Sequence, residues 1–416
     1  MRSELQVMRR SWPQDILAGV AVAIVALPLA LGFGVTSGAG PASGVATAII
    51  AGLVAALLGG SRYQVSGPTG AMTVVLVPII ATFGVEALFA VGLIAGVIIV
   101  LFGLFRLGRF MERIPWSVAE GFTLGIAVVI ALQQLPLVLQ VPRGEGTETL
   151  VVAWGAIAHA AKSGFNVASI IVVVSTLALK LSWSAFMKRM SWRFTIPASA
   201  VAVVVMTTAV CTLNLPLARI GALPASEIFH VNLAWPSIDI FSLIYSGLVI
   251  AFLGAIESLL SARVADSMAA SRDKTDVARH KPNQELFGQG VATLASALFG
   301  GMPATGAIAR TSVNVHAGAQ TRLASATHAL ALIAMVFALA PVVALVPTAV
   351  LAGVLLGTSW RIASPRSIIE AMRTTTLNKV TFVTTALAVI TIDLIWGTLI
   401  GVAVHFIGSL IQKSRP

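Results

Sequence analysis

Long apolar runs separated by short polar segments follow one another along almost the whole chain, as in VGLIAGVIIVLFGLF and SGLVIAFLGAIESLL. A helix needs about 20 predominantly apolar residues to cross a bilayer. The pattern therefore predicts an all-α polytopic membrane protein, with residues 1–416 forming a single transmembrane domain. A shorter apolar segment, residues 151–165, predicts an external interfacial helix with His159 and Lys162 facing water. We expect fourteen membrane-spanning segments, at residues 14–34, 42–60, 68–82, 87–105, 116–138, 166–183, 194–213, 241–265, 286–300, 304–316, 320–340, 343–360, 378–392 and 394–411.

The polar interruptions at the third and tenth segments contain nearly the same residues. AALLGG precedes SGPTGAM (66–72) in the first half, and SALFGG precedes MPATGAI (302–308) in the second half. Because each half holds seven segments, an odd number, the second copy must enter the membrane from the opposite side. The match therefore predicts two inverted repeats, at about residues 12–213 and 240–412, an architecture typical of secondary transporters and some channels. Glycine-rich helix packing is the alternative explanation.

Segments 68–82 and 304–316 are too short to cross about 30 Å of hydrocarbon at about 1.5 Å per residue. We expect half-helices that begin just after the Pro–Thr–Gly and Pro–Ala–Thr–Gly elements, with N-termini facing each other near the membrane midplane. Such N-termini carry unpaired N–H groups and about half a positive charge, which favours an anion. Kinked packing sites are the alternative. The candidates for substrate binding at these helix starts are Thr69, Gly70, Thr305 and Gly306.

Two ionisable residues lie at depth in the apolar segments, where such residues are candidates for function. Arg310 follows Gly306 by one helical turn, and Glu257 lies in the eighth segment. Arg310 stays protonated and would add its charge to those of the helix ends. An ionised Glu257 would oppose anion entry and a protonated Glu257 would release the attraction, which couples proton and anion movement. A structural ion pair between the two side chains is the alternative interpretation.

Composition supports the membrane assignment, since 57% of the residues are hydrophobic and only 10% are charged, with a mean hydropathy of +0.94. The net charge of +11 records orientation, because 21 of the 27 Lys and Arg residues fall in segments expected on one side of the membrane. Basic residues concentrate on the cytoplasmic side. We therefore expect a multi-pass protein of the cell (inner) membrane with cytoplasmic N- and C-termini. Membrane lipids are then partners, and nucleic acid is not.

The sequence contains no motif for other chemistry. It has one cysteine and no paired histidine spacing of a metal site, so we expect no metal and no cofactor. There is no nucleotide-binding loop and no nucleophile–base pair, so we do not expect an enzyme.

The motifs GPASGVATAIIAGLVAALLGGSRYQVSGPTGAM, GAIESLLSARVADSM and GGMPATGAIARTSVNVHAGAQTRLA resemble those of the SulP family of anion transporters. That family includes sulfate permeases, bicarbonate and dicarboxylate transporters, and the motor protein prestin. The resemblance implies a seven-plus-seven inverted-repeat fold of the UraA type, in which a core unit (segments 1–4 and 8–11) moves against a gate unit (segments 5–7 and 12–14). The implied anion site lies between the first segment and the two half-helices.

The resemblance also implies roles for individual residues. The family's anion site matches Phe33, Thr69, Ala309 and Arg310, while Leu29 stands where many members have Gln. The acid of proton-coupled members matches Glu257. Ser261, one turn further on, is the candidate for an additional oxygen ligand in a sodium-coupled relative, and we favour protons.

The resemblance further implies a homodimer and a C-terminal cytoplasmic STAS domain, which this sequence does not contain; a short member or a truncated chain would explain this. We expect a secondary active transporter of small anions, of the sulfate, bicarbonate or dicarboxylate class, working as a proton-coupled symporter by alternating access. The alternatives are an uncoupled anion channel, an exchanger or voltage-responsive motor of the same fold, and a nucleobase carrier.

Overall fold

Helices account for nearly all regular structure in the computed structural model, which describes residues 2–111, 114–144, 146, 148–190, 197–223, 228–229, 231, 235–273 and 279–413. Each of the fourteen predicted segments corresponds to a helix. Eight helices in the described ranges are long and apolar enough to cross a membrane. In the first half the helices are α1 (Arg2–Ser37), α2 (Pro41–Leu58), α3 (Gly70–Phe83), α4 (Ala87–Leu104), α6 (Trp116–Gln133), α9 (Val167–Met190) and α10 (Ala198–Thr212). In the second half they are α12 (Ile240–Asp273), α13 (Pro282–Leu298), α14 (Ile308–His316), α15 (Arg322–Ala344), α16 (Thr348–Ile362), α18 (Thr376–Thr391) and α19 (Leu394–Lys413).

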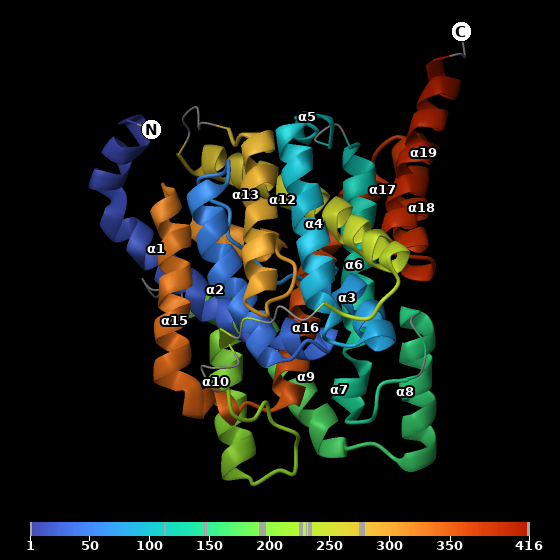
Figure 1. The fold of residues 1–416 in the computed structure, drawn as a ribbon. Helices are drawn as coiled ribbons and strands as arrows, with labels where there is room; N and C mark the ends of the chain where they lie inside the picture. Colours follow the sequence, from blue (N-terminus) through green and yellow to red (C-terminus); the bar gives the residue numbers. More distant parts are fainter. Residues whose placement is uncertain are drawn as a thin grey trace.

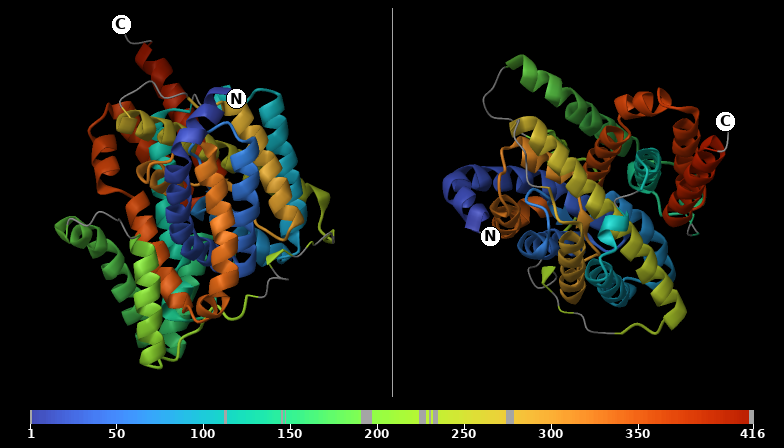
Figure 2. Two further views of the ribbon diagram at one scale, coloured as in Figure 1. Left: turned by 90° about the vertical axis from the view of Figure 1, so that its left-hand side faces the viewer. Right: turned by 90° about the horizontal axis from the view of Figure 1, so that it is seen from above.

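The helices form two groups that match the expected core and gate units. In the core, α13 packs between α2 and α4, α15 packs against α1 and α2, and α12 packs against α4. In the gate, α18 packs against α6 and α19, while α16 packs against α9 and α6. Viewed from above, the red helices α18 and α19 lie at the opposite edge of the molecule from α1 and α15 (Figure 2). The two units meet where α16 contacts α1 and where α6 contacts α3.

The described ranges also contain four helices outside these segments: α5 (Gly108–Met111), α7 (Leu135–Leu139), α8 (Thr149–Ser163) and α17 (Pro365–Met372). Helix α8 covers the segment predicted as an interfacial helix, and its His159 and Lys162 side chains are exposed. In Figure 1, α8 stands upright at the lower edge of the molecule, below α18, with its axis roughly parallel to the spans. The start of α1 and the end of α19 lie at the same end of the bundle, opposite α8 (Figure 1).

A short two-stranded ribbon joins the two halves of the core. Strand β1 (Ser66–Gly67) pairs antiparallel with β2 (Thr305–Gly306), so that Ser66 lies opposite Gly306 and Gly67 opposite Thr305. The half-helices start at Gly70 and Ile308, within one residue of the predicted positions just after the Pro–Thr–Gly and Pro–Ala–Thr–Gly elements. The backbone before each helix is extended, and each strand supplies the hydrogen-bond partners that the other needs within a membrane.

Both half-helices are too short to span a bilayer, as predicted. Helix α3 has 14 residues and α14 has 9, or about 21 Å and about 14 Å at 1.5 Å per residue. The side chains of Phe33, Met72 and Met302 are buried around the region where these helices begin. The ribbon and the two helix starts therefore lie inside the core unit, where irregular backbone is tolerated.

Candidate functional site

The ribbon places one threonine from each repeat at the same point. Thr69 ends the extended segment before α3, and its hydroxyl oxygen accepts a hydrogen bond from the backbone N–H of Met72 at 3.4 Å. Threonine is a favoured residue at this capping position, because its oxygen satisfies a backbone donor that the helix leaves unpaired. Thr305 lies in β2, and its Oγ1 is 3.0 Å from Oγ1 of Thr69. The tertiary fold thus joins two hydroxyls that lie 236 residues apart.

Glu257 completes this group from α12. Its Oε2 accepts the hydroxyl of Thr305 at 2.7 Å and the hydroxyl of Thr69 at 2.9 Å. Three oxygens are therefore in mutual contact, whereas the two hydroxyls supply only two hydrogens. A third hydrogen for the third contact is available when Glu257 itself carries a proton. We call Thr69, Thr305 and Glu257 the carboxylate–threonine site.

Arg310 lies in the first turn of α14 and is 1% exposed. Its Nη2 donates to the backbone carbonyl of Pro68 at 2.6 Å, which ties α14 to the segment before α3. Its Nη1 is buried without a hydrogen-bond partner among the described residues. No direct salt bridge joins Arg310 to Glu257 in the described structure, although the two charges interact electrostatically, so a structural ion pair stays the alternative interpretation.

Gly67 and Gly70 allow close approaches around the site. Gly67 has φ +153°, a backbone conformation that favours glycine, and a Cβ at this position would collide with the guanidinium of Arg310. A Cβ on Gly70 would collide with Ile130 of α6 and would lie 3.4 Å from Cε1 of Phe33. The start of α3 therefore contacts both α1 and the gate helix α6.

The other predicted residues lie near the site with different roles. The backbone N–H of Gly306 donates to Oγ of Ser258 at 3.1 Å. Ala309 is partly buried, next to Arg310. Ser261, the candidate sodium ligand, instead donates to Oγ1 of Thr311 at 3.3 Å. In the described ranges no three His, Cys, Asp or Glu side chains group as a metal site.

A buried polar network behind the ribbon was not predicted. Oε2 of Glu285 accepts the backbone N–H groups of Gly60 and Ser61, at 2.7 and 2.8 Å, and its Oε1 accepts Nε2 of Gln64 at 2.8 Å. Gln289, one turn further along α13, accepts the hydroxyl of Ser66 at 2.7 Å. The sequence signal was a Glu and a Gln four residues apart in an apolar segment, which places both on one helix face.

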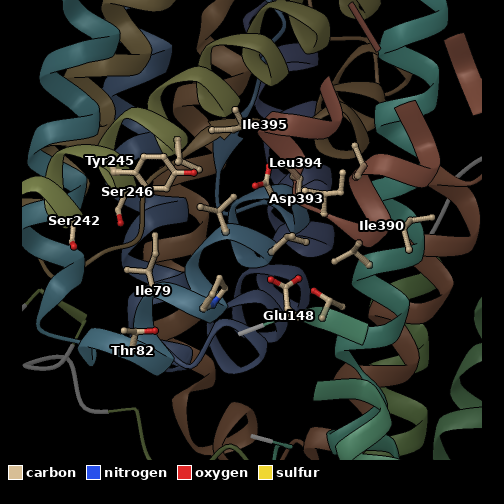
Figure 3. A pocket seen from close by; sticks show the side chains of 18 of the residues that line it. Ile79, Thr82, Glu148, Ser242, Tyr245, Ser246, Ile390, Asp393, Leu394 and Ile395 are labelled. Carbon is tan, nitrogen blue, oxygen red and sulfur yellow. The ribbon is translucent and has the colours of Figure 1, made fainter. Parts of the chain in front are cut away.

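Two cavities lie between core and gate, and none of the predicted site residues lines either of them. The larger has a volume of about 360 Å³ and is bounded by α3, α12, α18, α19 and the start of α8. Its lining is mainly apolar, with the carboxylates of Asp393 and Glu148 on one side and Tyr245, Ser246 and Ser242 on the other (Figure 3).

Comparison with known proteins bears out the family and the fold. The family model described as "Sulfate permease family" matches residues 13–385. The chain is 34% identical to YvdB of Bacillus subtilis over 96% of this chain and 73% of the relative. It is 34% identical to the bicarbonate transporter BicA of Picosynechococcus sp. (strain PCC 7002) over 82% of this chain and 60% of BicA.

A solved structure shows the same architecture. The transmembrane domain of a cyanobacterial bicarbonate transporter BicA superimposes with a TM-score of 0.80 at 27% identity, covering 95% of this chain and 98% of that domain. The fold is thus a membrane domain of fourteen segments in two inverted repeats. The family match covers most of the chain, and the relatives are transporters and not enzymes. This chain belongs to the sulfate permease family.

Proposed function

We propose that this protein is a secondary active transporter that carries a small anion across the membrane together with a proton. The observation that carries the proposal is that Glu257 accepts hydrogen bonds from the hydroxyls before the half-helices of both repeats, at 2.9 and 2.7 Å. All three residues belong to the core unit, so this carboxylate moves together with the proposed anion site when the core moves against the gate. A titratable group beside the anion site is suited to couple proton binding to anion binding and so to the conformational change.

The anion is proposed to bind at the N-terminus of α3, between Thr69, Gly70 and Phe33, with Thr305, Gly306, Ala309 and Arg310 on the facing side. The first N–H groups of α3 point towards this region, and Arg310 supplies a buried positive charge. Arg310 also holds the carbonyl of Pro68, so it positions the segment that carries Thr69. Names of relatives support sulfate or bicarbonate as the substrate class.

We propose alternating access as the transport mechanism, in which the core moves against the gate. The division of the helices into two packed groups, with fewer contacts between the groups, supports this mechanism. We place the protein in the cell membrane with both termini in the cytoplasm, since the ends of α1 and α19 lie together and the basic residues are concentrated there. A homodimer is the proposed assembly, by the resemblance to the family.

Uptake into proteoliposomes tests the function. Purified protein would be given [35S]sulfate, [14C]bicarbonate, [14C]succinate or [14C]uracil, with and without an inward proton gradient. Gradient-stimulated uptake of one anion is the expected result. Rapid conductive flux indifferent to protons would identify a channel, and uptake of uracil alone would identify a nucleobase carrier; either outcome contradicts the proposal.

A further inference from the structure

The smaller cavity differs from the larger one in the charge of its lining. It has a volume of about 290 Å³ and lies between the end of α1, α3, the junction of α6 and α7, and the segment leading into α8. A water molecule occupies about 30 Å³ of liquid, so a small oxyanion and several waters fit. We call it the Arg143 cavity. Its polar lining residues in the described ranges are Thr36, Gln133, Arg143 and Thr149.

Arg143 supplies a permanent positive charge to this cavity, since arginine does not lose its proton in proteins. Its Nη1 donates to the backbone carbonyl of Val77 in α3 at 3.2 Å, which directs the guanidinium from the loop onto the core unit. The side chain is also exposed to solvent. An anion arriving from solution can therefore reach the guanidinium without any rearrangement of the chain.

Gln133 gives the cavity an amide with unmet hydrogen bonds. Both Nε2 and Oε1 are buried and have no hydrogen-bond partner in the described structure. Buried polar atoms are normally paired, and each exception calls for a partner. An oxyanion with its hydration water meets both needs, because its oxygens accept from Nε2 and its water donates to Oε1.

The position of the cavity relates it to the carboxylate–threonine site. Thr36 lies one turn after Phe33 on α1, and Val77 lies two turns after Gly70 on α3, or about 10 Å along the helix axis. The same two helices thus border both places. The larger cavity adjoins at Thr149 but is lined by Glu148 and Asp393, whose charges repel anions.

We propose that Arg143 and Gln133 form a second binding site for a small oxyanion, which holds the anion between solution and the site at the start of α3. The inference rests on the proposed anion transport. It predicts that this site sets the concentration at which uptake is half-maximal and contributes little to the maximal rate, because the residues act before the coupled step.

Uptake kinetics of Arg143→Gln provide the test, with whichever of [35S]sulfate and [14C]bicarbonate the wild type transports. The half-saturating concentration should rise about tenfold, as for loss of one hydrogen bond to a charged group, with the maximal rate retained. Gln133→Leu should shift it in the same direction. Arg219→Gln is the matched control, since it removes an exposed charge from a different loop, and its kinetics should stay at wild-type values. Equal kinetics for Arg143→Gln and Arg219→Gln would overturn the inference.

A thermal-shift titration of the purified proteins with sodium sulfate separates this inference from the proposed function. If the wild type transports no anion but sulfate stabilises it in an Arg143-dependent way, the second site stands and the carrier is wrong. If the wild type transports an anion and Arg143→Gln changes neither uptake nor the titration, the carrier stands and the second site is wrong. Size-exclusion profiles of the variants establish that they are folded.

Discussion

Glu257 differs from the buried carboxylate of Glu285 in its position and in its hydrogen-bond partners. It lies half-way along α12, it contacts both repeats, and its partners are hydroxyls, which can both donate and accept. Glu285 is also buried, but it accepts backbone N–H groups, which can only donate, so its ionised form is held in place. Proton exchange is therefore expected at Glu257 and not at Glu285.

Replacement of Glu257 by Gln should mimic the protonated acid permanently. The variant should keep anion exchange between loaded liposomes and lose stimulation of uptake by a proton gradient. Glu285→Gln is the control, and it should remain proton-coupled even if its stability falls. Both are measured in proteoliposomes with and without the gradient. Proton-stimulated uptake by Glu257→Gln would remove Glu257 from the coupling mechanism.

Arg310 has a structural contact and a proposed electrostatic role, which two substitutions distinguish. Arg310→Ala removes the hydrogen bond to Pro68 and the charge, and should weaken anion uptake by about 1–3 kcal/mol or more. Arg310→Lys keeps the charge and one donor, and should retain part of the uptake. Anion dependence of initial uptake rates provides the measurement. Uptake by Arg310→Ala at the wild-type level would contradict the anion assignment.

The two half-helices and their ribbon form one structural element, because residues of each repeat contact and hydrogen-bond the extended segment of the other. Val65 accepts the backbone N–H of Ala307 at 3.0 Å, and the guanidinium of Arg310 lies against Gly67. A side chain at 67 would meet both an unfavourable backbone conformation and a filled space. The ribbon thus depends on glycine at this position for two separate reasons.

Gly67→Ala should therefore lower the free energy of unfolding more than a Gly→Ala substitution that causes backbone strain alone. Gly84, at the other end of α3, has φ +79° with nothing near its Cβ position, so Gly84→Ala is the matched control. Backbone strain alone costs about 1–3 kcal/mol. The loss of folding stability in Gly67→Ala should be larger than the loss in Gly84→Ala. Thermal unfolding in detergent measures both. Equal losses of stability would show that the guanidinium moves aside freely.

The apolar pattern was sufficient to predict these elements but not their pairing. Short apolar segments beside Pro, Thr and Gly predict half-helices wherever they occur. The partner of each extended strand lies about 240 residues away in the chain, and pairing depends on the packing of α2, α13 and α15 around it. The half-helices themselves were confirmed, with starts within one residue of the predicted ones, whereas the strand pairing between the repeats was not predicted.

The whole molecule consists of two packed groups of helices with a limited contact surface. One hydrogen bond across that surface joins Oγ1 of Thr36, at the end of α1, to Oε1 of Gln134, between α6 and α7, at 3.2 Å. The distance between these two side chains must change if the core moves against the gate. By contrast, Nε2 of Gln140 and Oγ1 of Thr348, also 3.2 Å apart, both belong to the gate.

Cross-linking of these two pairs tests movement between the units. A Thr36→Cys, Gln134→Cys double variant, linked by a short thiol-reactive reagent with a reducible spacer, should lose anion uptake and recover it on reduction. The Gln140→Cys, Thr348→Cys variant should keep uptake when linked. Both need Cys211→Ala, because Cys211 is a free thiol. Full uptake by the linked Thr36–Gln134 variant would contradict relative movement at this point.

The amino-acid sequence was enough to establish a membrane protein, its fourteen segments and its inverted repeat, and to name the candidate residues of the proposed site. Those properties follow from the transfer of apolar residues into lipid and from local backbone preferences, which depend on neighbouring residues. The contacts of Glu257 with two threonines, the hydrogen bond from Arg310 to Pro68 and the Arg143 cavity were decided by the tertiary structure. Each joins segments that are distant in the chain, and their distances depend on how every intervening helix packs.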